Sequence, residues 1–410
     1  MRRMATLNMI IATAGKRILN SLFSGLAIIW IAIFMSICLQ LKAQDTTMPC
    51  AITLNGYISE MPSLQFSSIA ADYEFSNQLH NRLNFKVQTG THLTAALELR
   101  TRFYYYGSDT NITSYYKLFE QDAGVVGLSK NIISGNNYVL NMAVDRLWID
   151  YSTGKWQFTL GRQRINWGQT FVWNPNDIFN TYNYLDFDYV EKPGSDAIRV
   201  QYYTSETSKA ELVVKADSSR KPSVAGLYRF NRRNYDIQFL AGLAGEDVVI
   251  GSGWSGQLAK GGFRGEISYF IPAKKFSLSK GELTSSIGWD YMFKNSLFLQ
   301  LECLYNGNHA DSTGINILDN NSFKISAQNP FLSGFSYFAS ASFPVTPLFN
   351  CSLAGIINPE NKVCIIVPSL DYNLLQNLDI SFLAQLIGFK TPPNPLATVS
   401  IWFLRIKYSF

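Results

Sequence analysis

Apolar and polar residues alternate along many short stretches of this 410-residue chain. In LHNRLNFKV (residues 79–87), Leu83 and Phe85 fall on one face of an extended chain, and Arg82 and Lys86 fall on the other. Successive side chains of a β-strand point to opposite faces, so the pattern predicts a strand with one apolar and one polar face. Comparable alternation occurs over residues 97–104, 145–151, 155–160, 196–204, 209–215, 234–243, 263–271, 285–294, 296–305 and 376–387.

Together with stretches that are harder to divide (222–231, 246–262 and 346–373), the pattern predicts about 16–18 strands, and barrels in bacterial membranes have even strand numbers. A soluble β-sandwich would also alternate, but its outward faces would be dense in charged residues. Here only 16% of residues are charged and 14% are aromatic, and aromatic residues border the apolar faces. The sequence therefore predicts an all-β protein, a transmembrane antiparallel up-and-down β-barrel.

The connections between these stretches fall into two lengths. Short turns are expected at 88–93, 152–155 and 294–296, and long connections from about 106 to 142, 163 to 195 and 306 to 334. Short turns at one end and long loops at the other are typical of outer-membrane barrels.

The C-terminal residues form a last alternating strand with two cations on its polar face, Arg405 and Lys407. This segment resembles the assembly signal of bacterial outer-membrane β-barrels, which implies the barrel-assembly machinery as a partner. The residues that carry this resemblance are Trp402, Leu404, Ile406, Tyr408 and Phe410.

The N-terminal residues have the pattern of an export signal. Four cations precede an apolar run from about 22 to 39, and a small residue, Ala43, follows. We expect residues 1–43 to be a signal peptide cleaved near Ala43, and 44–410 to form one barrel domain in the bacterial outer membrane. The alternative is an uncleaved membrane anchor.

Charge and motifs exclude several classes of function. Five of the 35 Lys and Arg residues lie in the leader, so the remainder balances the 30 Asp and Glu, and the composition gives no sign of nucleic-acid binding. The cysteines have no paired spacing, and no catalytic motif occurs, so neither a metal site, a cofactor nor an enzyme is predicted. A TonB-dependent transporter, with 22 strands and a plug domain, would not fit this length.

Residues 161–196 are the candidate functional segment. Continued alternation would place Arg162 and Arg164 in lipid, so we expect the chain to turn inward near Gly161. The segments LGRQRINWGQ, WNPNDIF and PGSDAIRVQYY resemble porin-like outer-membrane barrels of the Bacteroidetes type, related to alginate-export and other substrate-selective porins. The resemblance implies a pore with an inward-folded constriction.

One hypothesis is that the inward segment forms a charged eyelet with an aromatic lining. The alternative is a structural plug, in which Arg–Asp pairs and aromatic residues hold the loop against the wall. On the polar strand faces, 12 cations outnumber eight acids, a weak sign of anion preference. The candidate selectivity residues are Arg162, Arg164, Trp167, Trp173, Asp177, Asp186 and Asp188, with Arg82, Arg100, Arg102 and Arg146 on the wall.

The sequence thus predicts a channel for passive or substrate-selective diffusion of small hydrophilic solutes, anionic or saccharide, with outer-membrane lipid around it. Two alternatives stay open: a barrel hydrolase, and a surface-binding barrel that captures a polymer or partner through its long loops, such as 106–142.

Overall fold

The computed structural model describes most of the chain after residue 49. The described residues are 50–68, 73–107, 119–120, 122, 124–181, 184–187, 191, 193–218, 222–275, 277, 281–308, 325–391 and 394–410. The predicted leader, 1–43, lies outside them. None of the helices among these residues is long and apolar enough to cross a membrane.

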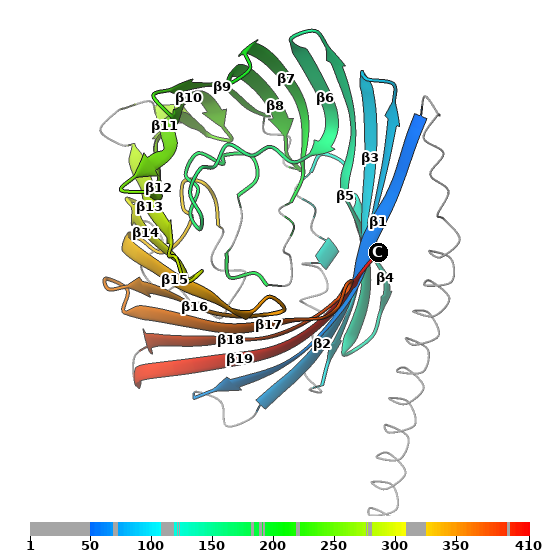
Figure 1. Cartoon of the computed structure of the whole chain (residues 1–410), viewed down its shortest axis with the longest axis vertical. Helices are drawn as coiled ribbons and strands as arrows, with labels where there is room; N and C mark the ends of the chain where they lie inside the picture. The colour runs from blue at the N-terminus through cyan, green and yellow to red at the C-terminus, as the bar shows by residue number, and fades with distance from the viewer. Residues whose placement is uncertain are drawn as a thin grey trace, which may run out of the picture. The chain divides into compact units, whose positions relative to one another are not determined.

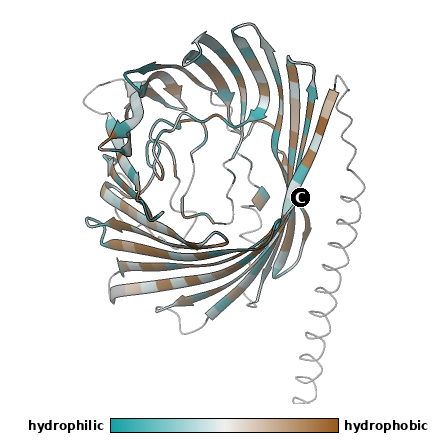
Figure 2. Ribbon diagram, in the orientation of Figure 1, coloured by the Kyte–Doolittle hydropathy of each residue, from teal (hydrophilic) through white to brown (hydrophobic). Residues whose placement is uncertain are grey.

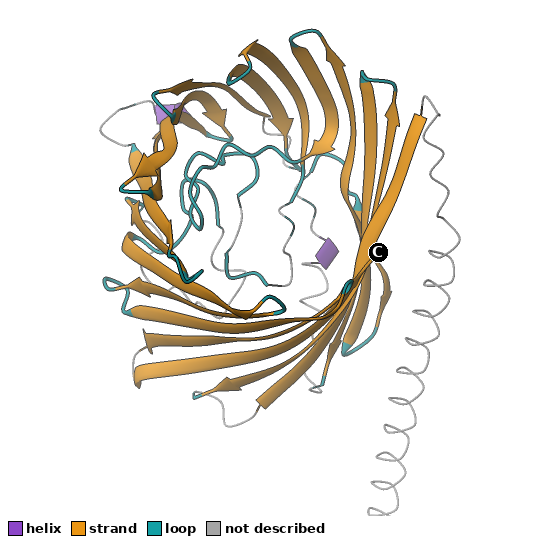
Figure 3. Ribbon diagram, viewed as in Figure 1, coloured by secondary structure: helices purple, strands orange, loops and turns teal. Residues whose placement is uncertain are grey.

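Nineteen strands form one sheet (Figures 1 and 3). They are β1 (Cys50–Ser67), β2 (Tyr73–Thr89), β3 (Leu93–Tyr106), β4 (Ser129–Ser134), β5 (Tyr138–Thr153), β6 (Trp156–Gln163), β7 (Ser195–Ser205), β8 (Ser208–Ala216), β9 (Pro222–Arg232), β10 (Tyr235–Ala244), β11 (Asp247–Leu258), β12 (Gly261–Pro272), β13 (Glu282–Met292), β14 (Phe298–Asn306), β15 (Gly334–Thr346), β16 (Phe349–Asn358), β17 (Val363–Leu375), β18 (Leu378–Thr391) and β19 (Asn394–Ser409), with a 3-10 helix η1 (Ala273–Lys275) after β12.

The sheet is closed. β19 pairs antiparallel with β1, and Tyr57 lies opposite Ser409. Without the short β4, which pairs only with β5, eighteen strands follow one another around the ring, each antiparallel to the next. Closure leaves no open sheet edge, as a barrel in lipid requires. The predicted fold class and strand number are confirmed.

The two faces of the wall differ as the alternation predicted. On β5, Leu147, Ile149 and Tyr151 are 49%, 55% and 47% exposed on the outside, whereas Asn141 is buried on the inside. Figure 2 shows the resulting succession of brown and teal bands along the strands. The outer face is therefore a broad apolar surface around the ring, whereas the inner face combines polar side chains with apolar clusters that pack against the loop after β6.

Long connections gather at one end of the barrel, because successive strands alternate in direction. The β3–β5, β6–β7 and β14–β15 connections lie at this end, and two-residue turns such as those of β5–β6 and β9–β10 lie at the other. The connection expected from about 106 to 142 is shorter than predicted, since β4 and the first part of β5 lie within it. A bulge between Glu98 and Leu99 in the β3–β5 pairing shifts the alternation of β5, which hid this part of the strand.

Candidate functional site

After β6 the chain leaves the wall and enters the barrel. We call residues 164–194 the inner loop; Figure 1 shows its described parts inside the ring of strands. Gly161 has φ 114°, and a Cβ there would lie 2.2 Å from the carbonyl oxygen of Leu147. Only glycine adopts this backbone easily, but the pairing with β7 continues through Gly161 to Gln163, so the chain leaves the wall slightly later than predicted.

Two buried glutamates of the wall hold the first part of the inner loop. Glu302 on β14 accepts hydrogen bonds from the backbone N–H groups of Phe171, Val172 and Trp173, at 2.9, 3.0 and 2.8 Å. A carboxylate that receives several backbone N–H groups is stabilised in its charged form, and it fixes the backbone that surrounds it. Ser286 on the neighbouring β13 donates a further bond of 2.8 Å to Glu302.

Glu266 on β12 forms the second anchor. Its carboxylate accepts the backbone N–H groups of Gln169, of Thr170 at 3.0 Å and of Asn176 at 2.8 Å. The loop approaches the wall closely here, and the Asn176 amide donates 2.9 Å to the carbonyl of Ser252 on β11. The anchored segment therefore turns back on itself along the wall.

A third attachment joins Trp167 to strands β8 and β10 of the wall. Its indole N–H donates 2.6 Å to Glu211 on β8, and its carbonyl accepts 2.6 Å from the amide of Gln238 on β10. Trp167 also meets the ring of Phe179 edge-on, with centroids 4.9 Å apart. Residues 165–181 thus line the wall from β8 to β15.

The second half of the inner loop crosses to the strands near the termini. Leu185 accepts a 2.8 Å bond from Gln385 on β18, and Phe187 packs against Phe403 on β19. Tyr57 on β1 donates 2.9 Å to Glu191. The described parts of both halves are therefore attached to the wall, and the loop narrows the bore.

Three aromatic residues of the inner loop, Trp167, Trp173 and Phe179, are buried. Trp167 is 1% exposed, Trp173 3% and Phe179 3%. Burial also raises the pKa of Tyr184, which packs against Phe338, and the carboxylate of Glu302 adds to this shift. Side chains this buried cannot offer a stacking face to a passing solute. In this structure Trp167 and Trp173 therefore hold the loop against the wall, as the structural-plug hypothesis describes.

The charged residues predicted on the inner loop are only partly brought together. Arg164 lies 3.4 Å from Asp177, which is 1% exposed and also accepts from the backbone N–H of Trp167. Asp186 lies in the half-buried segment 184–187, and Asp188 falls outside the described residues. No ring of these four charges is visible in the residues described.

Arg162 lies in the wall. Its guanidinium contacts Asp196 on β7 at 2.6 Å, Asp122 at 2.7 Å and the carbonyl of Val126 at 2.8 Å. A Cβ on Gly124 would lie 2.0 Å from the same guanidinium. Arg162 therefore attaches the segment that leads into β4 across the ends of β6 and β7, where the chain leaves the wall.

Three of the predicted wall arginines form one paired cluster. Arg82, 2% exposed, contacts Asp145 at 2.5 Å and also Glu98, and Arg100 contacts the same Asp145 at 3.1 Å. Arg146 lies 3.4 Å from Glu98. Their charges are largely neutralised by these carboxylates.

Arg102, the fourth predicted wall cation, has polar and aromatic partners. It donates 2.9 Å to the hydroxyl of Tyr104 and lies over the rings of Tyr104 and Phe119. This arrangement ties the segment before β4 to β3.

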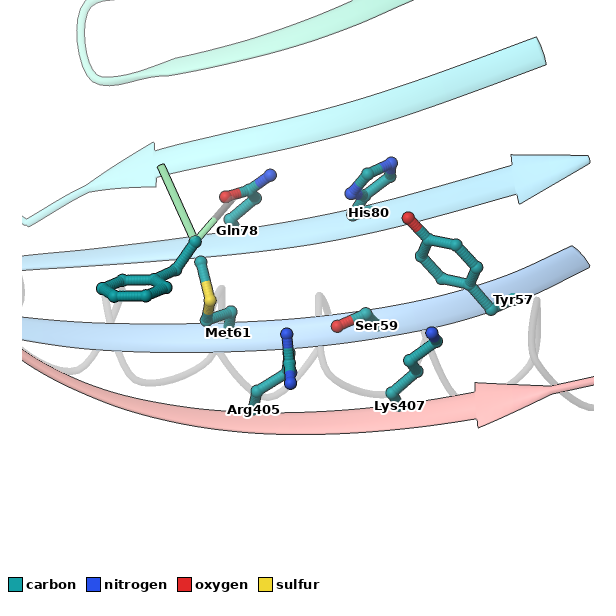
Figure 4. Close-up of a pocket in the computed structure, with 8 residues that line it drawn as sticks. Tyr57, Ser59, Met61, Gln78, His80, Arg405 and Lys407 are labelled. Atoms are coloured by element: carbon teal, nitrogen blue, oxygen red, sulfur yellow. The ribbon is translucent and has the colours of Figure 1, made fainter. Parts of the chain in front are cut away.

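A hollow in the inner wall presents a different set of residues. Figure 4 shows Arg405 and Lys407 of β19 facing the same space as Gln78 and His80 of β2. Lys407 lies 4.4 Å from the ring centre of Tyr57, and Arg405 donates 3.2 Å to Ser381. Within the part of the chain that the structure describes, neither cation has a carboxylate within ion-pair distance.

Gln78 and His80 add hydrogen-bonding capacity to this hollow. They are 6% and 5% exposed, and Gln78 Nε2 and His80 Nε2 have no hydrogen-bond partner among the residues that the structure describes. Buried polar atoms without partners are uncommon and mark a place for water or a ligand. No group of His, Cys, Asp and Glu side chains among the described residues is arranged to hold a metal ion.

Sequence reasoning missed two parts of this site. The anchoring role of Glu266 and Glu302 was not predicted, although alternation places both on the polar face of their strands. The hollow was missed as well, because its cations come from the last strand and its amide and imidazole from the second. The pairing of β19 with β1 and of β1 with β2 brings them together.

The last strand occupies the closing position that the assembly signal implies. Trp402, Leu404 and Ile406 are 37%, 41% and 39% exposed on the outer face, and Tyr408 lies opposite Ile58 of β1. Strand β19 ends at Ser409, one residue before Phe410.

Comparison with known proteins gives matches by structure alone. No family model matches the chain, and no curated protein matches it. The fold is similar to that of Pseudomonas aeruginosa OccK9 (OpdG), with a TM-score of 0.56, 10% identity, and coverage of 88% of this chain and 98% of that one. For P. aeruginosa OpdQ the TM-score is 0.55 and the identity 7%, with coverage of 90% of this chain and 99% of that one. For Acinetobacter baumannii OccAB4 the TM-score is 0.51 and the identity 9%, with coverage of 87% of this chain and 98% of that one. At such low identity the likeness establishes the fold: the chain has the closed antiparallel barrel of these proteins.

Proposed function

We propose that this protein is an outer-membrane channel through which small hydrophilic solutes diffuse, with a preference for anions. The observation that carries the proposal is a bore narrowed by a wall-anchored inner loop, with two inward cations, Arg405 and Lys407, that form no ion pair with a described carboxylate, Asp379 lying opposite Lys407 in the β18–β19 register. The similar structures are those of OprD/Occ outer-membrane channels, which supports the same class of function.

The charge preference is assigned to the hollow. Arg82, Arg100 and Arg146 are paired with acids, so they contribute little net field. Charged groups lining a narrow pore act strongly on permeating ions when they are not compensated nearby. An anion in the hollow would meet Lys407 and Arg405, with Gln78 Nε2 as a further donor.

The inner loop sets the width of the passage in this proposal. Trp167 and Trp173 hold it to the wall, and Arg162 stabilises the wall beside it. Of the residues predicted from the sequence, Arg164, Asp186 and Asp188 are left as the candidates for an eyelet on the loop itself.

Planar-bilayer recording in asymmetric KCl tests this function. We expect stable conductance, with a reversal potential that shows anion preference, and Lys407→Gln should reduce that preference. Lys274→Gln is the matched control, because Lys274 is 78% exposed and pairs with Glu246 away from the bore. Absence of conductance from correctly folded protein would overturn the channel, and an unchanged reversal potential in Lys407→Gln would overturn the role of the hollow.

A barrel hydrolase finds little support. Ser59 and His80 lie opposite each other in the β1–β2 register, which is the position a nucleophile and its base would need. No hydrogen bond joins them in the described residues, and His80 Nε2 has no partner. A surface-binding role is less favoured because residues 129–134 of the proposed capture loop belong to the wall as β4.

Location and processing are part of the proposal. Residues 1–43 would be removed as a signal peptide, 44–410 would form the barrel domain, and β19 would be recognised by the barrel-assembly machinery. The finer affiliation, to porins of the Bacteroidetes type related to alginate export, rests on the sequence segments around Arg162 and Asp177.

A further inference from the structure

The outer face of β1 carries a charged residue in the middle of its apolar row. Ile52, Leu54, Leu64 and Phe66 are 63%, 43%, 39% and 45% exposed on this face, and Glu60 is exposed between them. Glu60 lies six residues from Leu54 and six from Phe66 along the strand, so it belongs to the middle of the surface that lipid would cover. A carboxylate facing acyl chains is unfavourable.

A polar stripe continues from Glu60 across the neighbouring strands. Asn77, whose amide donates 3.2 Å to Glu60, lies on β2, and Asn81 lies on the same outer face. Paired positions follow one another from Ile58 to Asn81, Thr101, Met142 and finally Lys130 of β4. We define the polar stripe as Glu60, Asn77, Asn81, Thr101 and Lys130.

Lys130 faces outward as well. It is exposed and lies directly opposite Met142, which is 44% exposed on the outer face, whereas the next residue, Asn131, accepts a 3.0 Å bond from the buried, inward Asn141. Lys130 and Ile58, the two ends of this row, are separated by four strand spacings, about 19 Å.

The other outer strand faces are different. On the described strands other than β1 and β4, the exposed outward charges are Arg232, the last residue of β9, and Lys390, one residue before the end of β18. Asp196 also has outward parity, but Arg162 covers and neutralises it. Away from the strand ends, the exposed outward charges on the described strands that Arg162 does not neutralise are therefore one acid, Glu60, and one base, Lys130. Both lie on the same face of the barrel, between β1 and β4.

We propose that this face, from β1 through β2, β3 and β5 to β4, is the interface of a homodimer in which Glu60 of each copy pairs with Lys130 of the second copy. A twofold axis normal to the membrane places a residue on one side of an interface opposite the residue from the other side of the second copy. Glu60 and Lys130 lie at the two ends of the polar stripe, so the face is complementary to itself in charge. Asn77, Asn81 and Thr101 lie between them, where their hydrogen-bonding groups meet those of the second copy.

A second copy explains the stripe better than lipid or an unrelated protein would. Lipid chains offer no partner to Glu60 or to the Asn amides. An unrelated membrane protein would need the opposite charges at the same spacing, whereas a second copy supplies them by symmetry. The interface rests on the membrane location in the proposed function, but not on conductance.

Charge reversal tests the pairing. The dimer fraction of the full-length mature protein is measured in lipid bilayers by single-molecule photobleaching. We expect Glu60→Lys and Lys130→Glu each to weaken dimerisation about tenfold or more, since like charges then face each other, and the double reversal to restore it. Lys390→Glu, a reversal on the outer face of β18, is the matched control and should leave the dimer fraction unchanged.

Cysteine cross-linking tests the geometry separately. With the native cysteines replaced by serine, protein carrying Glu60→Cys is mixed with protein carrying Lys130→Cys. The mixture should form an interchain disulfide, and neither protein alone should do so. Within one chain the two positions are about 19 Å apart by strand spacing, too far for a disulfide.

These experiments distinguish a second copy of the chain from lipid or an unrelated protein on this face. A wild-type protein that is monomeric in the bilayer, or a dimer that both single reversals leave intact, would overturn the interface. Heat-modifiable migration in SDS gels shows whether each variant is folded, and a charge-reversed pair that restores the dimer cannot be explained by misfolding. Conductance of the same samples keeps failure of the channel distinct, because a non-conducting dimer would refute the pore alone.

Discussion

The backbone N–H of Trp173 donates a 2.8 Å hydrogen bond to the carboxylate of Glu302, which lies 129 residues further along the chain. Phe171 and Val172 donate to the same carboxylate. Three consecutive N–H groups that point to one anion hold the inner loop in place more firmly than side-chain packing alone would.

Replacing Glu302 by glutamine should loosen the inner loop. The amide keeps one acceptor but loses the charge and directs N–H groups toward donors, so we expect a loss of about 2 kcal/mol in the free energy of unfolding. Single-channel conductance should rise, because the loop then leaves the wall part of the time. Urea unfolding and bilayer recording of the same preparation check both effects.

Glu246→Gln is the control for this variant, since Glu246 is 47% exposed and pairs with Lys274 outside the bore. It should change neither quantity. A Glu302→Gln protein with wild-type conductance and stability would show that Glu302 does not anchor the loop.

Removing the buried cation of the arginine cluster should be costly. Arg82→Met removes the partner that Asp145, Glu98 and Glu191 share and leaves only Arg100 and Arg146 beside these three acids, so we expect about 3–5 kcal/mol of destabilisation. Adding Glu191→Gln should recover part of that loss, because it restores the balance of charges and leaves the Arg100–Asp145 and Arg146–Glu98 pairs intact. Denaturant midpoints of the single and double variants measure the coupling, and strictly additive effects would contradict it.

The fold could be predicted from the sequence where alternation is strict. On β5, Leu147, Ile149 and Tyr151 alternate with inward residues, and the strand was predicted there. The same strand was missed before the bulge at Asp145, because two consecutive residues, Asp145 and Arg146, both point inward. Alternation identifies a strand only as far as its pairing is regular.

The candidate site was predictable only in part for a related reason. The inward turn was predicted from the cost of placing Arg162 and Arg164 in lipid; the chain leaves the wall at Arg164, whereas Arg162 stays in β6 and is neutralised there. The anchors Glu266 and Glu302 lie 90 to 131 residues from their partners in the loop. Such pairs depend on which strands become neighbours around the ring, and local pattern does not contain that information. Arg162 shows the limit, since parity predicted that it would avoid lipid but not its bonds to Asp122, Asp196 and the carbonyl of Val126.

Two wall glycines make room for the inner loop. A Cβ at Gly253 on β11 would lie 2.8 Å from the Asn176 amide nitrogen, and one at Gly251 would lie 2.9 Å from its oxygen. Gly253→Ala should therefore displace Asn176 and destabilise the protein by about 1–3 kcal/mol. At Gly226 on β9 the nearest atom would be 3.6 Å away, so Gly226→Ala should be tolerated. Equal urea midpoints for the two variants would mean that the loop does not need this clearance.

Arg162→Gln distinguishes a wall clamp from a pore residue. The substitution removes the ion pairs to Asp122 and Asp196 and the bond to the Val126 carbonyl, so the segment 124–128 should detach and become sensitive to limited proteolysis. The reversal potential in asymmetric KCl should stay at the wild-type value, because the guanidinium is enclosed by the wall and meets no permeating ion. Lys407→Gln provides the contrast, with altered ion preference and an intact segment. If Arg162→Gln shifted the reversal potential as far as Lys407→Gln does while the segment stayed protected, Arg162 would belong to the eyelet that the sequence first indicated.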